Sequence, residues 1–264
     1  METIRLNKYL SDAGVCSRRE ADRWIEEGVV TVDGETASVG MRIAPESKIC
    51  VHGKPIKKEE EKVLLVMHKP AGIVCTAEKR EKNNVIDYMK YPKRVFPIGR
   101  LDKDSTGLLL MTNDGALVNK IMRAGNYHEK EYLVSVNKPI TEAFCKKMSQ
   151  GVEILDTLTR PCRVEKTGEK SFKIILTQGL NRQIRRMCEA LGYRVVTLHR
   201  VRIMNILLGD LKEGSYREVT PKERKLLDQM LEGSSSLSVK ERKKNSESVG
   251  KVEKVKKKGK RGAV

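Results

Sequence analysis

Two carboxylates stand in one polar loop, where they could transfer protons or attack an electrophilic carbon. The loop is Gly99–Gly107, which carries Asp102, Asp104 and two basic side chains between the apolar stretches Val95–Ile98 and Leu108–Met111. Loops held between strands often carry catalytic groups. For the loop alone, however, the better explanation is an ordinary turn in which one of the two aspartates bonds to nearby backbone.

A second candidate segment is the arginine-rich stretch Gln178–Glu189. Asn181 is a suitable N-cap, so the sequence predicts a helix that begins beside it. At about 100° per residue, Arg185 falls beside the apolar stripe of this helix, whereas Arg182 and Arg186 point away from it. A half-buried Arg185 needs a carboxylate partner, while the other two arginines suit solvent or phosphate. The apolar stripe consists of Ile184, Met187, Cys188 and Leu191.

The sequence disfavours nucleotide-driven and metal-driven chemistry. It contains no Gly-x-x-x-x-Gly-Lys-Ser/Thr, Gly-x-Gly-x-x-Gly, Gly-x-Ser-x-Gly or His-Glu-x-x-His motif. Its four histidines are scattered, and none of its six cysteines forms a Cys-x-x-Cys pair. We therefore expect no cofactor, no metal and reduced thiols in a protein that is not secreted.

The charge of the chain predicts a polyanionic partner. Its 264 residues include 53 Lys/Arg and 35 Asp/Glu, a formal net charge of +18. Neither a span-length apolar run nor a signal peptide is present, so we expect a cytoplasmic protein. An anionic membrane is a weaker alternative, because no basic helix has a strongly apolar face. With only seven Tyr, three Phe and one Trp, an RNA recognition motif or cold-shock barrel is disfavoured.

The chain is expected to begin with a small module, residues 1–56, and a solvated linker, residues 57–62. Gly14 should end a first helix, a Ser17–Glu20 capping box should open a second, and Asp33-Gly34 should turn a hairpin. Residues 233–264 should form a disordered Lys-rich tail, because residues 234–264 hold 11 Lys/Arg, three Asp/Glu and no aromatic residue.

Residues 63–232 are expected to form one strand-rich catalytic domain. Strands outnumber helices and do not alternate strictly with them, which favours an α+β fold with a mainly antiparallel mixed sheet. The expected strands are Val63–His68, Ile73–Thr76, Leu108–Thr112, Glu131–Val136, Arg163–Lys166, Phe172–Thr177, Val195–Leu198 and Val201–Ile206. The expected helices are Ala116–Arg123, Thr141–Met148, Arg182–Leu191 and a last one that starts at a Thr220–Glu223 capping box and ends at Gly233.

Several motifs in a fixed order carry a resemblance to known proteins. The N-terminal module resembles the α-L RNA-binding domain first known from a ribosomal protein. The rest resembles the RsuA-type family of pseudouridine synthases, and within it the RluF branch. The motifs are Arg5–Leu10 with the Asp33-Gly34 hairpin, Gly99–Asp102 with Thr106–Leu110, Thr112–Gly115, Tyr127–Tyr132, Gln178–Glu189 and Arg202–Asn205.

The resemblance implies a reaction and a site. Such enzymes isomerise uridine to pseudouridine within RNA without cofactor, metal or energy source, in a central cleft of the catalytic domain. The family's catalytic aspartate corresponds to Asp102, which would attack the ribose carbon or assist removal of a sugar proton. Arg185 corresponds to the arginine that pairs with it, and Tyr132 to the tyrosine beside the target base. On sequence alone, Tyr132 would more simply be a core aromatic of a strand.

The resemblance also implies how RNA is held. Arg100 would enter the space left by the extruded nucleotide, since the target must leave its helix. The module holds 10 basic and 9 acidic residues in positions 1–58, so its RNA-binding face must be local. The expected RNA-binding residues are Arg5, Lys8, Arg18, Arg19, Arg23, Arg100, Arg182 and Arg186.

We therefore expect a monomeric RNA pseudouridine synthase. Its expected partner is 23S rRNA or a ribosome assembly intermediate, with a tRNA anticodon region as a second substrate, and no membrane. The alternative is a non-catalytic ribosome-associated RNA-binding protein on the same fold. Asp102, Tyr132 and Arg185 speak against that alternative, since all three catalytic positions are filled.

Overall fold

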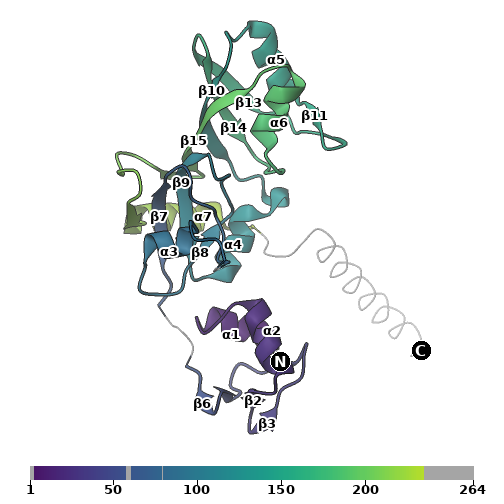
Figure 1. Cartoon of the computed structure of the whole chain (residues 1–264), viewed down its shortest axis with the longest axis vertical. Coiled ribbons are helices and arrows are strands. Elements are labelled where there is room, and N and C mark those ends of the chain that lie inside the picture. The colour runs from purple at the N-terminus through teal and green to yellow at the C-terminus, as the bar shows by residue number, and fades with distance from the viewer. Residues whose placement is uncertain (1–2, 58–60, 79, 235–264) are drawn as a thin grey trace, which may run out of the picture. The chain divides into compact units, whose positions relative to one another are not determined.

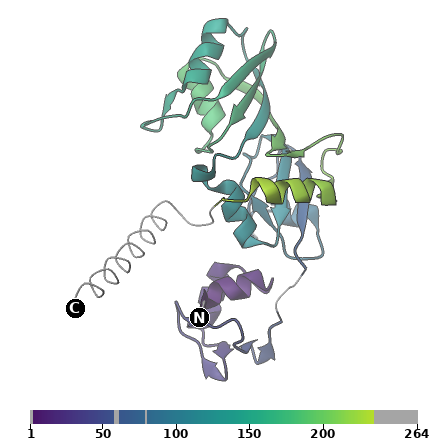
Figure 2. The same ribbon diagram turned by 180° about the vertical axis from the view of Figure 1, so that it is seen from behind.

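The computed structural model describes residues 3–57, 61–78 and 80–234 (Figures 1 and 2). These residues divide into two compact bodies. The first body comprises residues 3–115 and 208–219, and the second comprises residues 116–207 and 220–234. The strand ladders within each body are antiparallel, and short helices are interspersed among the strands. These features confirm the predicted α+β class with a mainly antiparallel sheet. Most of the expected tail and residues 58–60 of the expected linker lie outside the described residues.

The first body begins with two helices and a small sheet. The strand order is β3-β2-β5-β6, and a separate ladder joins β1 to β4. The elements are β1 (Ile4–Arg5), α1 (Leu6–Asp12), α2 (Arg18–Glu26), β2 (Val30–Val32), β3 (Glu35–Thr36), β4 (Arg42–Ile43), β5 (Ile49–Val51) and β6 (Lys54–Pro55).

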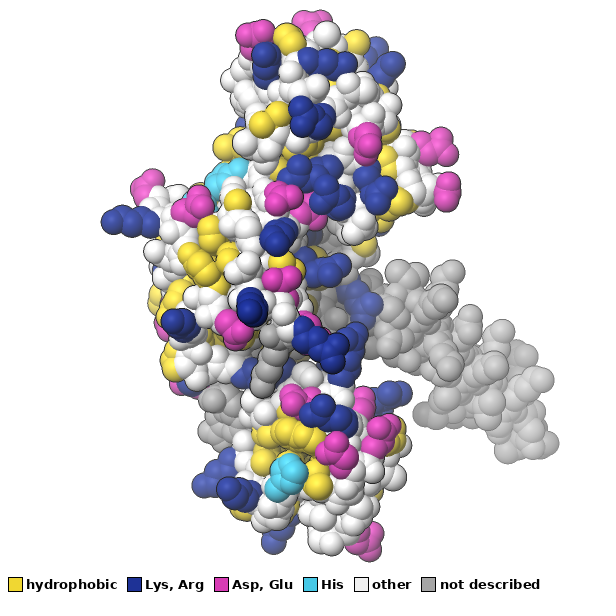
Figure 3. Space-filling view, in the orientation of Figure 1, with side chains coloured by type: hydrophobic (Ala, Val, Ile, Leu, Met, Phe, Trp, Pro, Cys, Tyr) yellow, Lys and Arg dark blue, Asp and Glu magenta, His cyan; other side chains and the backbone are white. Residues whose placement is uncertain are grey.

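Local signals place these elements as the sequence predicts. Ser17 Oγ accepts from the Glu20 amide at 3.1 Å and caps α2, while Gly14 takes a positive φ after α1. Asp33 and Gly34 both have positive φ, as a two-residue hairpin turn requires, and they join β2 to β3. Acidic and basic side chains are interleaved over this part on the face shown in Figure 3, so the charge is mixed here.

The remainder of the first body is a sheet in which β7 lies between β9 and β17, with β8 also paired to β9. The strands β7 and β9 are almost continuously buried, which explains their unbroken apolar sequences. The elements are β7 (Leu64–Lys69), α3 (Val85–Met89), β8 (Phe96–Ile98), β9 (Thr106–Thr112) and β17 (Tyr216–Glu218).

The expected strand Ile73–Thr76 is wrong. This segment is a loop that makes one isolated bridge, between Val74 and Asn84. Its backbone bonds are local, because the Val74 amide donates to Asn83 O and the Thr76 amide to Val74 O. Gly72, with φ of 85°, turns the chain away from β7 before a ladder can form.

The second body packs two helices on a four-stranded sheet. Its strand order is β13-β14-β10-β15, and β16 pairs with β15. The elements are α4 (Gly115–Met122), the 3₁₀-helix η1 (Ala124–Asn126), β10 (Lys130–Val136), α5 (Glu142–Gln150), β11 (Glu153–Ile154), β12 (Thr157–Leu158), β13 (Arg163–Gly168), β14 (Ser171–Leu176), α6 (Gln183–Ala190), β15 (Val195–Ile203), β16 (Ile206–Leu207) and α7 (Pro221–Met230). The sequence analysis predicted two separate strands, Val195–Leu198 and Val201–Ile206. This prediction is wrong, since the single strand β15 runs from Val195 to Ile203.

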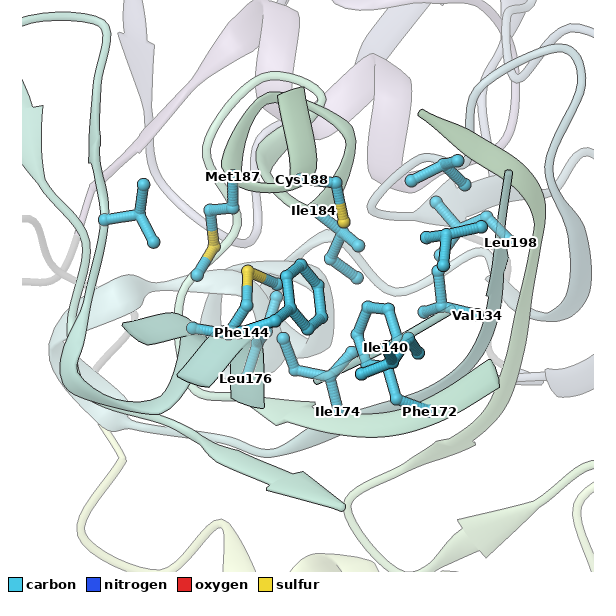
Figure 4. Packing of buried hydrophobic residues seen from close by; sticks show 14 of the residues in the cluster. Val134, Ile140, Phe144, Phe172, Ile174, Leu176, Ile184, Met187, Cys188 and Leu198 are labelled. Carbon is cyan, nitrogen blue, oxygen red and sulfur yellow. The ribbon is translucent and has the colours of Figure 1, made fainter. Parts of the chain in front are cut away.

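The core of the second body lies between this sheet and helices α5 and α6 (Figure 4). Phe144 of α5 meets Phe172 of β14 edge to face, with ring centroids 5.4 Å apart. Ile184, Met187 and Cys188 of α6 point into the same apolar layer. The predicted stripe of α6 is therefore confirmed for these residues, and it fixes which side of the helix faces away from the sheet.

Candidate active site

Asp102 lies in a tight turn between β8 and β9 in the first body. The Ser105 amide donates to Asp102 O at 3.1 Å, which closes the turn over Lys103 and Asp104. Asp102 is partly buried, whereas Lys103 and Asp104 are exposed. The loop does form a turn, but the bond that closes it joins two backbone groups, whereas the prediction invoked an aspartate side chain. The turn leaves Asp102 as the more sheltered carboxylate.

A buried lysine that the sequence analysis missed supports this turn. Lys69, at the end of β7, is 0% exposed, and its Nζ donates to the carbonyls of Pro70 at 2.8 Å, Lys103 at 3.2 Å and Ser105 at 2.8 Å. Burying an ammonium is costly unless its donors are satisfied, and an ammonium has three. The Gly72 amide adds a bond of 2.8 Å to Lys103 O. The turn that carries Asp102 is thus fastened to the strand beside it.

Tyr132 lies on β10 in the second body, with a buried arginine opposite. Tyr132 pairs with Arg200 of β15 on one side and with Ile174 of β14 on the other. Arg200 is 2% exposed, and its Nη1 donates to Tyr132 Oη at 3.4 Å. Directly opposite residues share a face of the sheet. The face that is apolar at Ile174 therefore becomes cationic next to Tyr132.

Lys130, two residues before Tyr132, adds a second buried cation. Its side chain is on the same face as Tyr132, because alternate residues of a strand share a face, and Lys130 is 5% exposed. Burial, and then the nearby charge of Arg200, lower the pKa of Lys130 to about 8. Its Nζ donates to His128 O at 3.4 Å. The start of β10 therefore concentrates positive charge around the tyrosine.

An ion cluster on the other face fixes the start of β10 against β15. Arg202 donates through Nε to Glu131 at 2.8 Å and through Nη2 to Glu129 at 3.0 Å. Burial opposes the charged form of Glu129, but bonds from Arg202 and Arg163 outweigh it and lower the pKa of Glu129. The ladder shifts register between Glu131 and Tyr132, because β15 holds one extra residue, Val201, between their partners Arg202 and Arg200. This bulge in β15 lets Arg202 and Arg200 lie on opposite faces of the sheet.

The arginines of α6 differ from one another in exposure. Arg185 is partly buried, as the helical angle predicts. Burial of Cys188 raises the pKa of its thiol to about 12, and the nearby positive charge of Arg185 offsets part of this effect. Arg182 is exposed, as expected. Arg186 is also partly buried, which corrects the expectation that it points fully away. Its guanidinium folds back onto Asn181, with Nε 3.1 Å from the carbonyl oxygen and Nη2 3.3 Å from Oδ1.

Asn181 is not the N-cap of α6, contrary to the prediction. The cap position belongs to Arg182, in a left-handed conformation with φ of 49°. Gln183, which is buried, instead accepts the Leu180 amide on its Oε1 at 3.0 Å. The arginine helix therefore begins from an ordered turn, with the side chain of Asn181 bonded to Arg186.

The remaining predicted residues lie in the first body. Arg100 is exposed in the loop before Asp102. Arg5 of β1, and Arg18, Arg19 and Arg23 of α2, are exposed, while Lys8 of α1 is partly buried. Arg23 is within 3.6 Å of Glu27 and 3.5 Å of Glu20, so its charge is partly neutralised. An Asn7–Asp22 contact of 2.9 Å ties the two helices together.

Neither metal ligands nor membrane spans stand out in the described part of the chain. Among residues 3–57, 61–78 and 80–234, no three His, Cys, Asp or Glu side chains are grouped as a metal ion would require. Within the same residues, no helix has the length and apolar character needed to cross a bilayer. The six cysteines, all within these ranges, are unpaired with one another.

Comparison with known proteins places the chain among RNA-modifying enzymes. Residues 4–49 match the S4 domain, and residues 63–190 match RNA pseudouridylate synthase. The chain is 53% identical over 236 residues to "Dual-specificity RNA pseudouridine synthase RluF" of Escherichia coli strain K12, covering 89% of this chain and 81% of that protein. It is 35% identical over 232 residues to "Ribosomal large subunit pseudouridine synthase B" of Bacillus subtilis strain 168, covering 84% of this chain and 95% of that protein.

A solved structure supports the same placement. A crystal structure of a pseudouridylate synthase superposes with a TM-score of 0.63 at 28% sequence identity. The match covers 86% of this chain and 99% of that one. Both the fold and the sequence are therefore shared along nearly the whole described chain.

Proposed function

Because the chain belongs to the RsuA-type family of RNA pseudouridine synthases, we propose that it isomerises uridine in 23S rRNA, with Asp102 as the essential carboxylate. A uridine in a tRNA anticodon region is the proposed second target, in line with the dual specificity in the name of the Escherichia coli relative. Identity above 50% over most of the chain favours the enzyme over the non-catalytic alternative. We further propose that it acts as a cytoplasmic monomer and needs no cofactor.

The reaction is balanced without an external reactant. The bond from the ribose C1′ to N1 of uracil breaks, the base turns, and C1′ bonds to C5. The proton leaves C5 and one is gained at N1. An ionised Asp102 serves either proposed route, by attack on C1′ or by removal of a sugar proton. The observation that carries this assignment is the ordered turn that holds Asp102. The buried Lys69 donates hydrogen bonds to two backbone carbonyls of this turn, those of Lys103 and Ser105.

Two residues of the second body have proposed supporting roles. Arg185 would pair with Asp102, and its partial burial suits a guanidinium that binds a carboxylate at two points. Tyr132 would pack beside the target base. Its hydroxyl accepts a hydrogen bond from Arg200, which orients the ring and supports a role in moving a proton. The target must be extruded from its helix, and Arg100 would fill the space that it leaves.

The division of labour along the chain is also proposed. Residues 1–56 would hold RNA through Arg5, Lys8, Arg18, Arg19 and Arg23, with residues 57–62 as the linker. Residues 63–232 would carry the chemistry, with Arg182 and Arg186 on phosphates, and residues 233–264 would add nonspecific attraction. The exposure of the α2 arginines supports the first role. Contacts to phosphate would position the enzyme, while base contacts would select the target.

One experiment tests the proposed targets. The purified protein is incubated without cofactor with unmodified 23S rRNA and with unmodified tRNA, and pseudouridine is mapped chemically at single-nucleotide resolution. We expect new pseudouridine in 23S rRNA, and at lower yield in the anticodon region of a tRNA. Pseudouridine in neither RNA would contradict the proposed targets.

A further inference from the structure

A tyrosine and an arginine form a stacked pair on the surface of the second body. Tyr127, between η1 and β10, is 60% exposed, and the guanidinium carbon of Arg160 lies 4.1 Å from its ring centroid. We propose that this pair is a stacking site for an unpaired base of the RNA substrate beside the target uridine. The inference rests on the RNA-isomerising function and adds a contact that selects or positions the substrate.

The pair is held in place from both sides. Arg160 Nη1 donates to Ala124 O at 2.7 Å, and the Arg160 amide donates to Gln178 Oε1. Gln178 is buried, which makes it a firm anchor. Tyr127 has a left-handed backbone with φ of 57°, and its amide closes η1 onto Ala124 O. A large ring kept exposed in an uncommon backbone conformation does not serve the core.

The pair lies at the same end of the sheet as Tyr132. Lys130, the first residue of β10, pairs with Leu176, the last residue of β14. The loops that carry Tyr127 and Gln178 therefore leave the sheet at one end, and Arg160 joins them there. Tyr132 is only two residues inside that end of β10. A base stacked on Tyr127 would thus belong to the same stretch of RNA as a base beside Tyr132.

The charge of the three segments around the pair favours RNA over a protein partner. Residues 120–130, 155–163 and 178–186 contain eight Lys/Arg and two Asp/Glu. Arginine beside an aromatic ring provides both a cationic contact to phosphate and a flat partner for the ring. Stacking of single-stranded bases on aromatic side chains is largely independent of sequence, because every base has a π-face. This chemistry suits nucleotides that flank a modified uridine.

The test uses Tyr127 variants of the full-length protein. Affinity for unmodified 23S rRNA is measured for Tyr127→Ala, Tyr127→Phe and Tyr127→Trp, and single-turnover isomerisation is followed in parallel. The control is Leu158→Ala, which removes an apolar side chain that is 67% exposed in the neighbouring hairpin. Emission from the indole of Tyr127→Trp is recorded with and without a short oligouridine, above the background of Trp24.

We expect Tyr127→Ala to weaken binding about tenfold, while Tyr127→Phe and Tyr127→Trp stay within about twofold of wild type because they keep a ring. Leu158→Ala should bind as wild type. Oligouridine should quench the indole of Tyr127→Trp, which a pair that merely joins two loops would not cause. Unchanged affinity of a folded Tyr127→Ala, or unquenched emission with RNA bound, would overturn the inference. If the wild type itself makes no pseudouridine but quenching occurs, the proposed function fails and the stacking site stands.

Discussion

At the scale of single residues, the turn that presents Asp102 depends on the buried ammonium of Lys69. Lys69→Met keeps the aliphatic stem but removes the ammonium that donates to the carbonyls of Pro70, Lys103 and Ser105. We expect a loss of about 2–4 kcal/mol in the free energy of unfolding, because buried unsatisfied acceptors are costly. Isomerisation should fall as the turn loosens. Denaturant unfolding and single-turnover assays measure the two effects.

The control for that prediction is Lys103→Met, in the same turn. Lys103 is exposed, so the substitution should change stability by less than about 0.5 kcal/mol. Equal stability of Lys69→Met and Lys103→Met would show that the turn does not depend on the buried ammonium.

The arginines of α6 offer a second comparison at this scale. Arg185→Ala should abolish turnover, because Asp102 would lose its proposed partner. Its side chain is only partly buried, so we expect a stability loss of about 1–3 kcal/mol, below that of a fully buried pair. Arg186→Ala should cost about 1 kcal/mol through its bonds to Asn181, with weaker RNA binding at most. Arg185→Lys should not restore activity, since an ammonium lacks the planar two-point contact.

Melting temperatures and single-turnover rates of these three variants test the proposed pairing of Arg185 with Asp102. If Arg185→Ala retains normal turnover, or behaves in both assays as Arg186→Ala does, the proposed pairing is wrong.

Residue types and spacing identified some of these positions but not all. The Asp102 turn and the partial burial of Arg185 follow from local pattern, since both depend on neighbours a few residues away. Lys69 and Arg200 were missed because their partners lie far along the chain: Ser105 is 36 residues from Lys69, and Tyr132 is 68 residues from Arg200. A charged residue within an apolar strand was the available signal for both.

At the scale of elements, the start of β10 should make stability depend on pH. The pKa of Lys130 is lowered to about 8 in the folded protein from the ordinary 10.5, by burial and by Arg200. Between those values the unfolded chain binds more protons, so stability rises with pH. Relative to Lys130→Met, the wild type should gain stability with pH between pH 8 and 10, with a slope of at most about 1.4 kcal/mol per pH unit. The free energy of unfolding of both proteins is measured by urea titration at several pH values. An equal dependence of this free energy on pH in the two proteins would contradict the prediction.

Apart from the wrong N-cap at Asn181, caps and turns were predicted well, because a few adjacent residues determine them. The Thr220–Glu223 capping box is present in full, and Ser17 caps α2. The positions of strands were predicted less accurately, because strand pairing depends on residues far along the chain. Val74 has β propensity, but Gly72 and the local bonds to residues 83 and 84 keep its segment out of the sheet. In β15, His199 and Arg200 interrupt the apolar pattern, yet pairing with β10 continues through both.

At the scale of the whole molecule, the N-terminal part should contribute affinity rather than chemistry. The double variant Arg18→Glu, Arg19→Glu reverses two exposed charges on α2. Each lost phosphate contact should reduce the slope of log affinity against log salt by roughly 0.7–0.9, so binding weakens most at low salt. Turnover of bound RNA should persist. Filter binding across a salt series gives the slope.

The matched control is Lys48→Glu with Lys54→Glu, which changes the charge equally at two other exposed positions in the same part. Because the charge of this part is mixed, only a local face should bind RNA. Equal effects of the two double variants would indicate nonspecific attraction and count against the α2 face.

The central claim is that Asp102 performs the isomerisation, and Asp102→Asn tests it most directly. The amide keeps the size of the side chain and removes its negative charge, which both proposed routes require. The measurement is single-turnover formation of pseudouridine in 23S rRNA at saturating enzyme, beside a binding titration and a matched Asp104→Asn variant. We predict that Asp102→Asn binds RNA with wild-type affinity and forms no pseudouridine, while Asp104→Asn, exposed in the same turn, is close to wild type. Normal turnover by folded Asp102→Asn would contradict the account.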